Sequence, residues 1–203
     1  MSDVIDMLAY EKAAQMQGFG RICGVDEVGW GPLAGPIYSC AVILPAGFDM
    51  AGVTDSKKLS EKKREALYEP LCKAVTYSIG ICTVEEFETL GAAEARWESM
   101  RRAVAGLNGG ADFALVDGNH MPQLGVNGQC IVKGDGVSAS IAAASILAKV
   151  ARDRYMVELA REYPQYGFEV HKGYGTKRHM EAIREFGPCP MHRSRYIRKV
   201  LAK

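Results

Sequence analysis

The chain has 203 residues, a formal net charge of +1 and six cysteines, and a chain of this length buries roughly 70% of its unfolded surface without a disulfide or a structural metal. The cysteines are scattered, with no Cys-x-x-Cys pair, so their spacing excludes a structural zinc site and predicts reduced, intracellular thiols. No stretch reaches the roughly 20 apolar residues that span a bilayer, and no signal-peptide core begins the chain, which predicts a soluble, cytoplasmic protein.

The first half of the chain predicts helices interleaved with three strands. Apolar runs of strand length and helical periodicities alternate with breaks rich in glycine. Ser60 stands where a helix N-cap belongs. The expected elements are a helix over 6–17, strands over 22–25 and 37–44, a helix over 60–73, a strand over 74–82 and a helix over 84–107.

Two adjacent acids, Asp26 and Glu27, follow the first strand and precede a glycine-rich segment, 29–36. Successive strand residues point to opposite faces, so we expect the strand to end or bend here if both acids serve one site. Gly29 and Gly31 give the backbone that freedom and let it approach a ligand closely. For this segment taken alone, a solvent-facing turn with incidental acids is the alternative.

The glycine spacing is also partly similar to a dinucleotide-binding loop, an interpretation that the residues exclude. The spacing of Gly29, Gly31 and Gly35 is one residue too long, and Pro32 removes an amide from a phosphate cradle. The segment leads into the β-like run 37–44, where the dinucleotide-binding pattern requires a helix.

Two further acids, Asp117 and Asp135, each close an apolar strand run beside a glycine. Ligands usually bind at the carboxyl ends of strands in α/β sheets. The alternative for either acid is a turn residue or a helix N-cap, and Asp135 precedes a predicted helix. The expected elements are strands over 113–116 and 130–132 and helices over 138–163, 176–186 and 194–201.

Three consecutive strands followed by strands mixed with helices predict an α/β fold with one mixed central sheet flanked by helices. We expect residues 1–170 to form the main domain and residues 171–203 a small basic helical extension packed on it. The extension carries nine Lys and Arg against two Glu, on an otherwise acidic chain, which indicates contact with a polyanion. A solvated basic helix without a partner is the alternative.

Four converging carboxylates need a compensating positive charge, because like charges raise one another's pKa. Hard oxygen ligands suit Mg²⁺ or Mn²⁺, which also take water and substrate phosphate oxygens. Two such ions about 3.5–4 Å apart activate a water molecule and stabilise the leaving oxygen in phosphodiester hydrolysis. The candidate ligands are Asp26, Glu27, Asp117 and Asp135.

Several short segments carry a resemblance to a known family. They are 24–29 (GVDEVG), 31–36 (GPLAGP), 54–60 (TDSKKLS), 116–119 (VDGN), 133–135 (KGD), 140–150 (SIAAASILAKV), 152–153 (RD) and 171–176 (HKGYGT). In this order and with similar spacing, from about residue 22 to residue 192, the chain resembles ribonuclease HII.

The resemblance implies a ribonuclease H-like fold. It also implies hydrolysis 5′ to ribonucleotides, in RNA–DNA hybrids and where ribonucleotides are embedded in duplex DNA, leaving a 3′-hydroxyl. The family's metal-binding carboxylates fall on the four acids above. Tyr174 would pack on the deoxyribose beyond the ribonucleotide, where a ring leaves no room for a 2′-hydroxyl; a half-buried loop aromatic is the alternative. We expect the protein to act as a monomer on nucleic acid, without a membrane partner.

Three lysines are candidate phosphate contacts: Lys57, Lys58 and Lys149. Each contact would add a salt-dependent contribution that carries no sequence information. A solvated surface charge is the alternative for each. For His171, assistance to product release and a hydrogen bond within its loop both stay open.

The clearest departure from the family is Gly29-Trp30-Gly31, where the family has Gly-Arg-Gly. The resemblance implies that the backbone of this loop reads the ribose 2′-hydroxyl, a group that distinguishes RNA from DNA, and both glycines remain. We expect the arginine's contacts to be lost, at roughly 1.5–3 kcal/mol for a charge-assisted bond, while Trp30 could stack on a sugar or base instead. Departures at 88–93 and 192–196 are expected to affect packing on the substrate side.

A non-catalytic protein that binds RNA–DNA hybrids is the alternative function. Trp30 would then have relaxed the recognition of the RNA–DNA junction. Binding without cleavage in Mg²⁺ or Mn²⁺ would favour this alternative.

Overall fold

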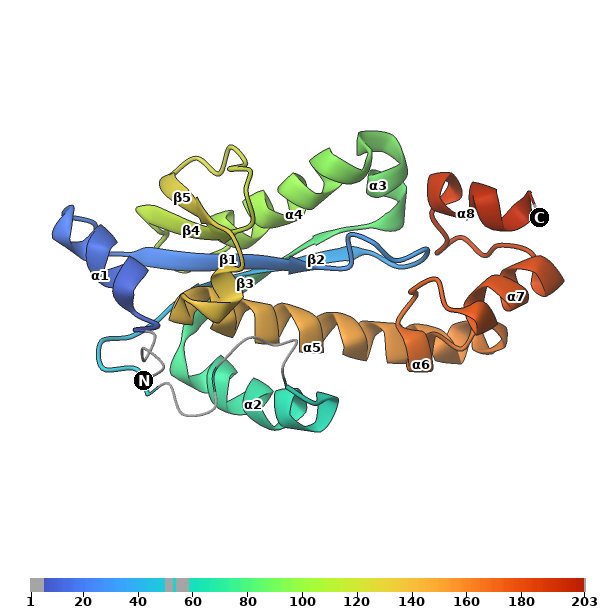
Figure 1. Ribbon diagram of the computed structural model, residues 1–203, viewed down its shortest axis with the longest axis horizontal. Helices are drawn as coiled ribbons and strands as arrows, with labels where there is room; N and C mark the ends of the chain where they lie inside the picture. The colour runs from blue at the N-terminus through green and yellow to red at the C-terminus, as the bar shows by residue number, and fades with distance from the viewer. Residues whose placement is uncertain (1–5, 50–52, 54–58, 203) are drawn as a thin grey trace, which may run out of the picture.

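A computed structural model describes residues 6–49, 53 and 59–202, whose five strands form one sheet in the order β3-β2-β1-β4-β5. β1 (Ile22–Val28), β2 (Ile37–Ile43) and β3 (Thr76–Cys82) pair antiparallel in turn. β4 (Phe113–Asp117) and β5 (Asn127–Ile131) continue the sheet parallel to β1. The predicted mixed sheet is therefore confirmed (Figure 1).

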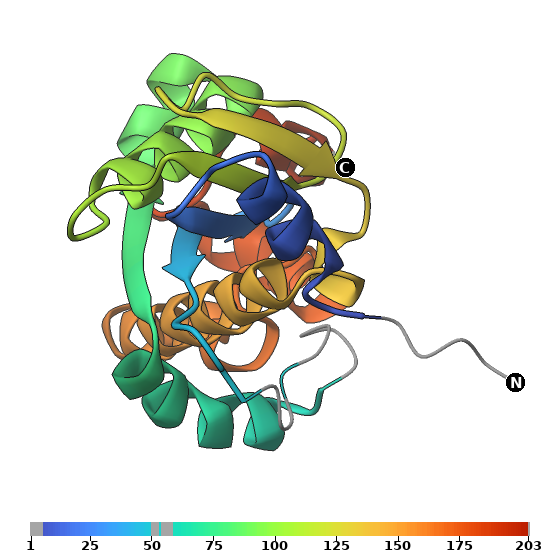
Figure 2. The same cartoon turned by 90° about the vertical axis from the view of Figure 1, so that its left-hand side faces the viewer.

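Helices cover both faces of the sheet, as Figure 2 shows. α5 (Ala139–Glu162) crosses one face, where its alanines pack against Cys40 and Val42 of β2. α4 (Ala92–Ala105) crosses the other, where Met100 packs with Cys23 and Val25 of β1. All six cysteines are free thiols in this structure.

The α5 layer approaches the sheet at a glycine. A Cβ atom on Gly24 would lie 2.2 Å from the carbonyl carbon of Ser140, so only a residue without a side chain fits between β1 and α5. The start of α5 is also bound to α1 (Ala9–Met16). The buried Glu11 carboxylate accepts hydrogen bonds from the hydroxyls of Ser138 and Ser140, each at 2.7 Å.

Most predicted helices are confirmed, with one correction. The predicted helix over 84–107 is two helices, α3 (Val84–Leu90) and α4, because Gly91 has a φ of +82° that no helix continues. Ser60 caps the helix that begins at Glu61, as predicted, and its hydroxyl accepts from the Lys63 amide at 3.3 Å. The remaining elements are α2 (Glu61–Ala74), η2 (Gly134–Gly136), η3 (Pro164–Tyr166), α6 (Phe168–His171), α7 (Lys177–Phe186) and α8 (Ser194–Leu201).

Among the described residues, none of the helices has the length and apolar character that a membrane span requires.

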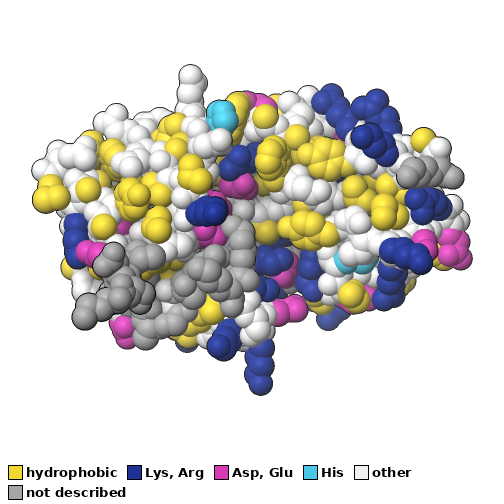
Figure 3. Space-filling view, viewed as in Figure 1, with side chains coloured by type: hydrophobic (Ala, Val, Ile, Leu, Met, Phe, Trp, Pro, Cys, Tyr) yellow, Lys and Arg dark blue, Asp and Glu magenta, His cyan; other side chains and the backbone are white. Residues whose placement is uncertain are grey.

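The last helices, α6 to α8, lie at one end of the molecule, where Figure 3 shows Lys and Arg side chains gathered. The boundary predicted at residue 170 falls inside α6. Two cations of this basic region, Lys172 and Arg193, are buried, so they do not contribute to a surface that binds polyanions.

The buried guanidinium of Arg193 holds the glycine-rich segment 29–36 in place. Its five N–H groups donate to the carbonyl oxygens of Gly29, Trp30, Pro32 and Gly35, over 2.6–3.0 Å. Burial lowers the pKa of Arg193 to about 10, so the group stays charged at neutral pH. A segment whose β-pairing in the described structure is a single bridge, between Ala34 and His192, thereby has these four carbonyls satisfied.

Arg152 of α5, also fully buried, completes this bonding. It donates to the carbonyl oxygens of Pro36 at 2.9 Å, Ala34 at 3.1 Å and Lys172 at 3.0 Å. The last of these bonds joins the glycine-rich segment to the loop that carries Tyr174. The two arginines therefore fix the glycine-rich segment, helix α5 and the loop that carries Tyr174 relative to one another.

Two buried histidines, His179 and His192, form a chain of hydrogen bonds that ends at the Tyr174 carbonyl. The Cys189 amide donates to His192 Nδ1 at 3.0 Å, the Nε2 atoms of His192 and His179 are 3.0 Å apart, and His179 Nδ1 contacts the Tyr174 carbonyl at 2.9 Å. The Tyr174 carbonyl only accepts, so His179 carries its proton on Nδ1. His192 Nδ1 accepts from the Cys189 amide, so His192 carries its proton on Nε2. Both rings must be neutral, because a proton on His179 Nε2 would face the one on His192.

His171 stacks on His179 with ring centroids 4.3 Å apart. Its Nε2 donates to the Tyr166 carbonyl at 2.8 Å, and its Nδ1 accepts from the Gly173 amide at 3.2 Å. Of the two roles left open for His171, the structure places it in the loop hydrogen bond.

We predict that Arg193→Leu destabilises the protein by at least about 2 kcal/mol, because buried carbonyl groups left without donors cost roughly 1–3 kcal/mol each. Urea unfolding monitored by circular dichroism measures the change. Arg195→Leu, an exposed neighbour, is the matched control. An equal loss in both variants would contradict this assignment.

We predict that the free energy of unfolding falls more steeply in the wild type than in His192→Gln as the pH drops from about 6.5 toward 4. Burial lowers the pKa of His179 and of His192 to about 4 and also lowers that of His171. The unfolded chain therefore binds more protons in this window, at up to about 1.4 kcal/mol per pH unit for each proton. Urea unfolding at pH 7, 6 and 5 measures the slope.

The slope should be smaller in His192→Gln and unchanged in His120→Gln, whose histidine is exposed in wild type. A slope of the unfolding free energy against pH that is the same in His192→Gln as in the wild type would show that this histidine is not buried as a neutral ring, and this comparison cancels the opposite contribution of the buried carboxylates.

Candidate active site

Strand register brings the first two acidic segments side by side. β1 and β4 are parallel neighbours in which Val25 pairs with Val116. The residues that follow these two, Asp26 and Asp117, therefore lie next to each other at the same edge of the sheet. This is the carboxyl end of both strands, where the sequence predicted a ligand site.

The strand does not end at these acids: β1 remains paired with β2 through Val28. The alternation of a strand is kept instead. Asp26 points toward α5, where Ser145 hydrogen-bonds it, and Glu27 points toward α4, where Arg96 lies. Asp26 and Glu27 nevertheless line one cavity of about 120 Å³.

Burial and mutual repulsion make the ionised form of these acids costly. Burial, followed by the negative charges of Glu27 and Asp117, raises the pKa of Asp26 well above its usual range, although bonds from Ser145 and the Glu27 amide oppose this. Burial also raises the pKa of Glu27, against the charge of Arg96. A further positive charge would relieve both groups.

Asp135 lies in the short 3₁₀ helix η2, four residues beyond the end of β5. The prediction that it closes a strand is therefore wrong, because Lys133, at a φ of +56°, turns the chain first. It is also not the N-cap of α5, since Ser138 holds that position. Asp135 is 3% exposed, and its neighbour Gly134 donates its amide to Asp117 Oδ1 at 2.7 Å.

Tyr174 and Lys149 line the same cavity as Asp26 and Glu27. Lys149 Nζ is 5.9 Å from the centre of the Tyr174 ring and 2.8 Å from Asp153 Oδ1. The ring is 43% exposed, so it can contact a ligand. These two predicted substrate residues are thus brought to the acids, whereas Lys57 and Lys58 lie outside the described residues.

Trp30 has a different environment from the one expected for it. Its indole Nε1 donates to the Ala92 carbonyl at 3.1 Å, and its ring lies 5.2 Å from the guanidinium carbon of Arg96. The loop itself carries no arginine, but α4 supplies a guanidinium beside residue 30. Gly29 has a φ of +91°, and a Cβ atom there would lie 2.2 Å from Arg152.

The departures at 88–93 and 192–196 contact each other. The Glu88 carboxylate accepts from the amide of Ser194 at 2.8 Å and also bonds its hydroxyl. This contact joins α3 to the start of α8. Whether it affects the substrate side stays a prediction.

Sequence reasoning missed three polar residues of the site: Arg64, Arg96 and Ser145. Arg64 and Ser145 line the cavity, and Arg96 is bound to Glu27. The helical patterns that contain them gave no signal, because a helix presents a polar residue to a site and to solvent with the same spacing.

The carboxylates suit a hard divalent cation. Within residues 6–49, 53 and 59–202, no three His, Cys, Asp or Glu side chains are grouped closely enough to form a complete metal site by themselves. Mg²⁺ commonly needs only one or two carboxylates, with water and phosphate oxygens as its other ligands. Asp26 and Asp117 lie side by side at the ends of neighbouring strands, and Glu27 has one guanidinium beside it, so the donor set fits such an ion.

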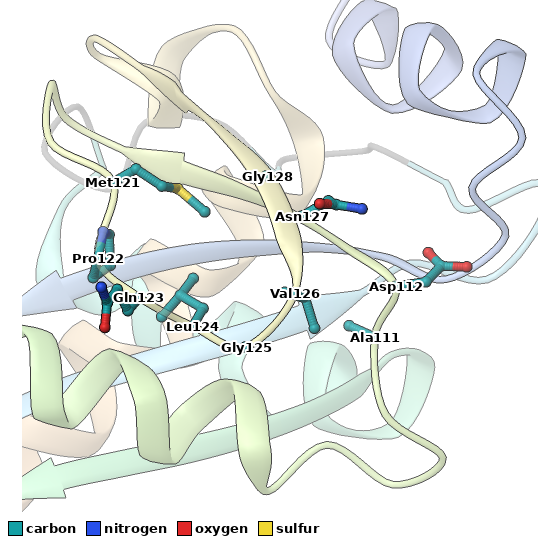
Figure 4. A pocket seen from close by; sticks show the side chains of 10 residues that line it. All are labelled: Ala111, Asp112, Met121, Pro122, Gln123, Leu124, Gly125, Val126, Asn127 and Gly128. Carbon is teal, nitrogen blue, oxygen red and sulfur yellow. The ribbon is translucent and has the colours of Figure 1, made fainter.

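A larger hollow of about 780 Å³ lies at the opposite ends of β4 and β5 (Figure 4). The acid among its lining residues is Asp112, whose two oxygens accept from the amides of Gly20 at 2.8 Å and Arg21 at 2.9 Å. This carboxylate is used to hold the start of β1. The hollow therefore offers no chemistry comparable to that of the acidic cavity.

Comparisons with known proteins agree with this geometry. The family model for ribonuclease HII matches residues 23–199. Ribonuclease HII of Shewanella halifaxensis is 48% identical over 202 residues, covering 98% of this chain and 99% of that protein. Ribonuclease HII of Caldicellulosiruptor bescii is 46% identical over 187 residues, covering 92% and 91%.

The fold agrees as well. The crystal structure of ribonuclease H2 from Pyrococcus horikoshii OT3 matches with a TM-score of 0.75 at 25% identity, covering 90% of this chain and 98% of that one. Sequence and fold together show that the chain belongs to the ribonuclease HII family of endonucleases.

Proposed function

We propose that this chain hydrolyses the phosphodiester 5′ to ribonucleotides, in RNA–DNA hybrids and at ribonucleotides embedded in duplex DNA, leaving a 3′-hydroxyl. The observation that carries the proposal is the meeting of Asp26, Glu27 and Asp117 at one edge of the sheet, beside a cavity that Tyr174 and Lys149 also line. The names of the relatives support the same substrate class.

In this proposal Asp26, Glu27, Asp117 and Asp135 hold two ions of Mg²⁺ or Mn²⁺. Such ions, when bound, lower the pKa of water and stabilise charge on the leaving oxygen. Ser145 orients Asp26 through its hydroxyl. The binding-only alternative is not favoured, since the chain keeps all four acids and belongs to a family of nucleases.

The substrate side of the proposal rests on Tyr174 and the glycine-rich loop. Tyr174 packs on the deoxyribose that follows the ribonucleotide, and the backbone at Gly29 and Gly31 reads the ribose 2′-hydroxyl. The His179 ring holds the Tyr174 carbonyl at 2.9 Å, which keeps the loop in one position. Lys149, together with Lys57 and Lys58, contacts backbone phosphates. The protein acts as a monomer.

We predict that the wild type cuts an end-labelled DNA duplex 5′ to a single embedded ribonucleotide in Mg²⁺ or Mn²⁺ and that EDTA abolishes cleavage. Asp26→Asn should lose at least about 100-fold in rate, because the ions lose a ligand and one negative charge. A gel that resolves the labelled products measures position and rate.

An RNA tract hybridised to DNA, run beside the first substrate, separates the two parts of the proposal. Cleavage of the tract alone would show a nuclease without junction recognition. Absence of cleavage of either substrate in both metals would overturn the catalytic proposal and leave hybrid binding.

We predict that Asp26→Asn raises the melting temperature of the metal-free protein at pH 7.5 by at least about 2 °C, since 1 kcal/mol corresponds to roughly 2–4 °C at this size. The raised pKa of Asp26 means that ionisation above the unfolded pKa of about 3.9 costs folding free energy, which a neutral amide avoids. Differential scanning fluorimetry in EDTA measures the shift.

Asp6→Asn is the control of opposite sign, because the Lys12 side chain and the Leu8 amide lower the pKa of the exposed Asp6. Asp6→Asn should not raise the melting temperature. A fall in the melting temperature of Asp26→Asn would mean that the Asp26 carboxylate is compensated within the metal-free fold.

A further inference from the structure

Arg96 of α4 is bound to Glu27 by two contacts. Its Nε lies 2.8 Å from Glu27 Oε1 and its Nη2 3.1 Å from Oε2. The two side chains are 16% and 13% exposed, so solvent screens their attraction little. The Nη2 contact is a hydrogen bond and the Nε contact a close ion pair, so Arg96 restrains the Glu27 carboxylate and partly neutralises its charge.

The Trp30 ring packs against the same Arg96 guanidinium. The ring lies 5.2 Å from the guanidinium carbon, within the range of a cation–π contact. The indole Nε1 is bonded to Ala92, one helical turn before Arg96, and the Trp30 carbonyl accepts from Arg193 at 2.9 Å. Both the ring and the backbone of Trp30 are therefore fixed.

The same guanidinium lies beside the second acidic segment. A Cβ atom built on Gly118, the residue after Asp117, would be 3.2 Å from Arg96 Nη2. Arg96 is thus a cation placed between the acids of β1 and the end of β4. A guanidinium carries one charge and only donates hydrogen bonds, so it neutralises these acids in part and cannot replace a divalent ion.

We propose that Arg96 is a positioning residue that competes with divalent cations for Glu27 and so weakens metal binding until a substrate is present. The inference rests on the proposed function, in which Glu27 is a metal ligand. Glu27 Oε2 already accepts a hydrogen bond from Arg96, and Oε1 lies 2.8 Å from Arg96 Nε, so a cation that binds Glu27 meets a positive charge beside it. Substrate phosphates add negative charge and oxygen ligands, and they offset this cost.

The test is calorimetric titration of Mn²⁺ into the substrate-free protein. Arg96→Gln should bind Mn²⁺ about tenfold more tightly than wild type, a change equivalent to roughly 1.4 kcal/mol. Arg96→Met, which removes the charge but keeps the length of the side chain, should change the affinity in the same direction. Arg101→Gln is the matched control, because it removes an arginine of the same helix that pairs with Glu94 and Glu98.

A second titration measures the dependence on substrate. A DNA duplex nicked 5′ to its single ribonucleotide, the product of the proposed cleavage, keeps the 2′-hydroxyl and cannot be cut there again; it should raise the Mn²⁺ affinity of the wild type more than that of Arg96→Gln. Trp30→Leu should fall between the two, since its Arg96 keeps the charge but loses the ring that holds it. An affinity of Arg96→Gln equal to or weaker than that of wild type would overturn the proposal.

Asp26→Asn separates failure of this inference from failure of the proposed function. If Asp26→Asn weakens Mn²⁺ binding while Arg96→Gln leaves it unchanged, the metal site stands and the role of Arg96 is wrong. If Asp26→Asn leaves Mn²⁺ binding unchanged, the carboxylates do not hold the metal, and both proposals fail.

Discussion

The buried guanidinium of Arg193 is the interaction on which the site depends most. A segment with glycines of positive φ at positions 29 and 35 has no intrinsic preference for one shape, and fixing it costs conformational entropy. Arg193 gives this segment five hydrogen bonds, and Arg152 adds further ones at its other end. Because Arg193 comes from the connection to α8, the carboxyl-terminal helices are part of the architecture of the site as well as a basic surface.

The sequence was sufficient to predict the sheet and its acids, because both depend on local patterns. The apolar runs before Asp117 and before the Asp26–Glu27 pair predicted two of the strands, although β1 continues past its acids to Val28. The bonds that complete the site are long-range: Glu27 and Arg96 are 69 residues apart, and Gly29 and Arg193 are 164 apart. No periodicity records such pairings. The break at Gly91 was missed because a single glycine inside a helical pattern is a weak signal.

The environment of Trp30 shows a limit of comparing motifs residue by residue. In the sequence, a tryptophan in place of the family arginine reads as the loss of a charge. In the structure, the guanidinium of Arg96 lies against that tryptophan and is bonded to Glu27. A guanidinium therefore lies beside residue 30, and helix α4 supplies it. A substitution at either residue has to be judged together with the other, because neighbours in contact are not energetically independent.

Helix α5 links distant parts of the molecule at fixed intervals. It meets the backbone of β1 at Ser140, bonds Asp26 through Ser145, carries Lys149 into the cavity and binds the glycine-rich segment through Arg152. With a rise of about 1.5 Å per residue, the stretch from Ser140 to Arg152 spans roughly 18 Å. One inserted or deleted residue within it would rotate everything beyond by about 100°. The length of this stretch is therefore fixed more strictly than its composition, and variation in chain length has to occur elsewhere.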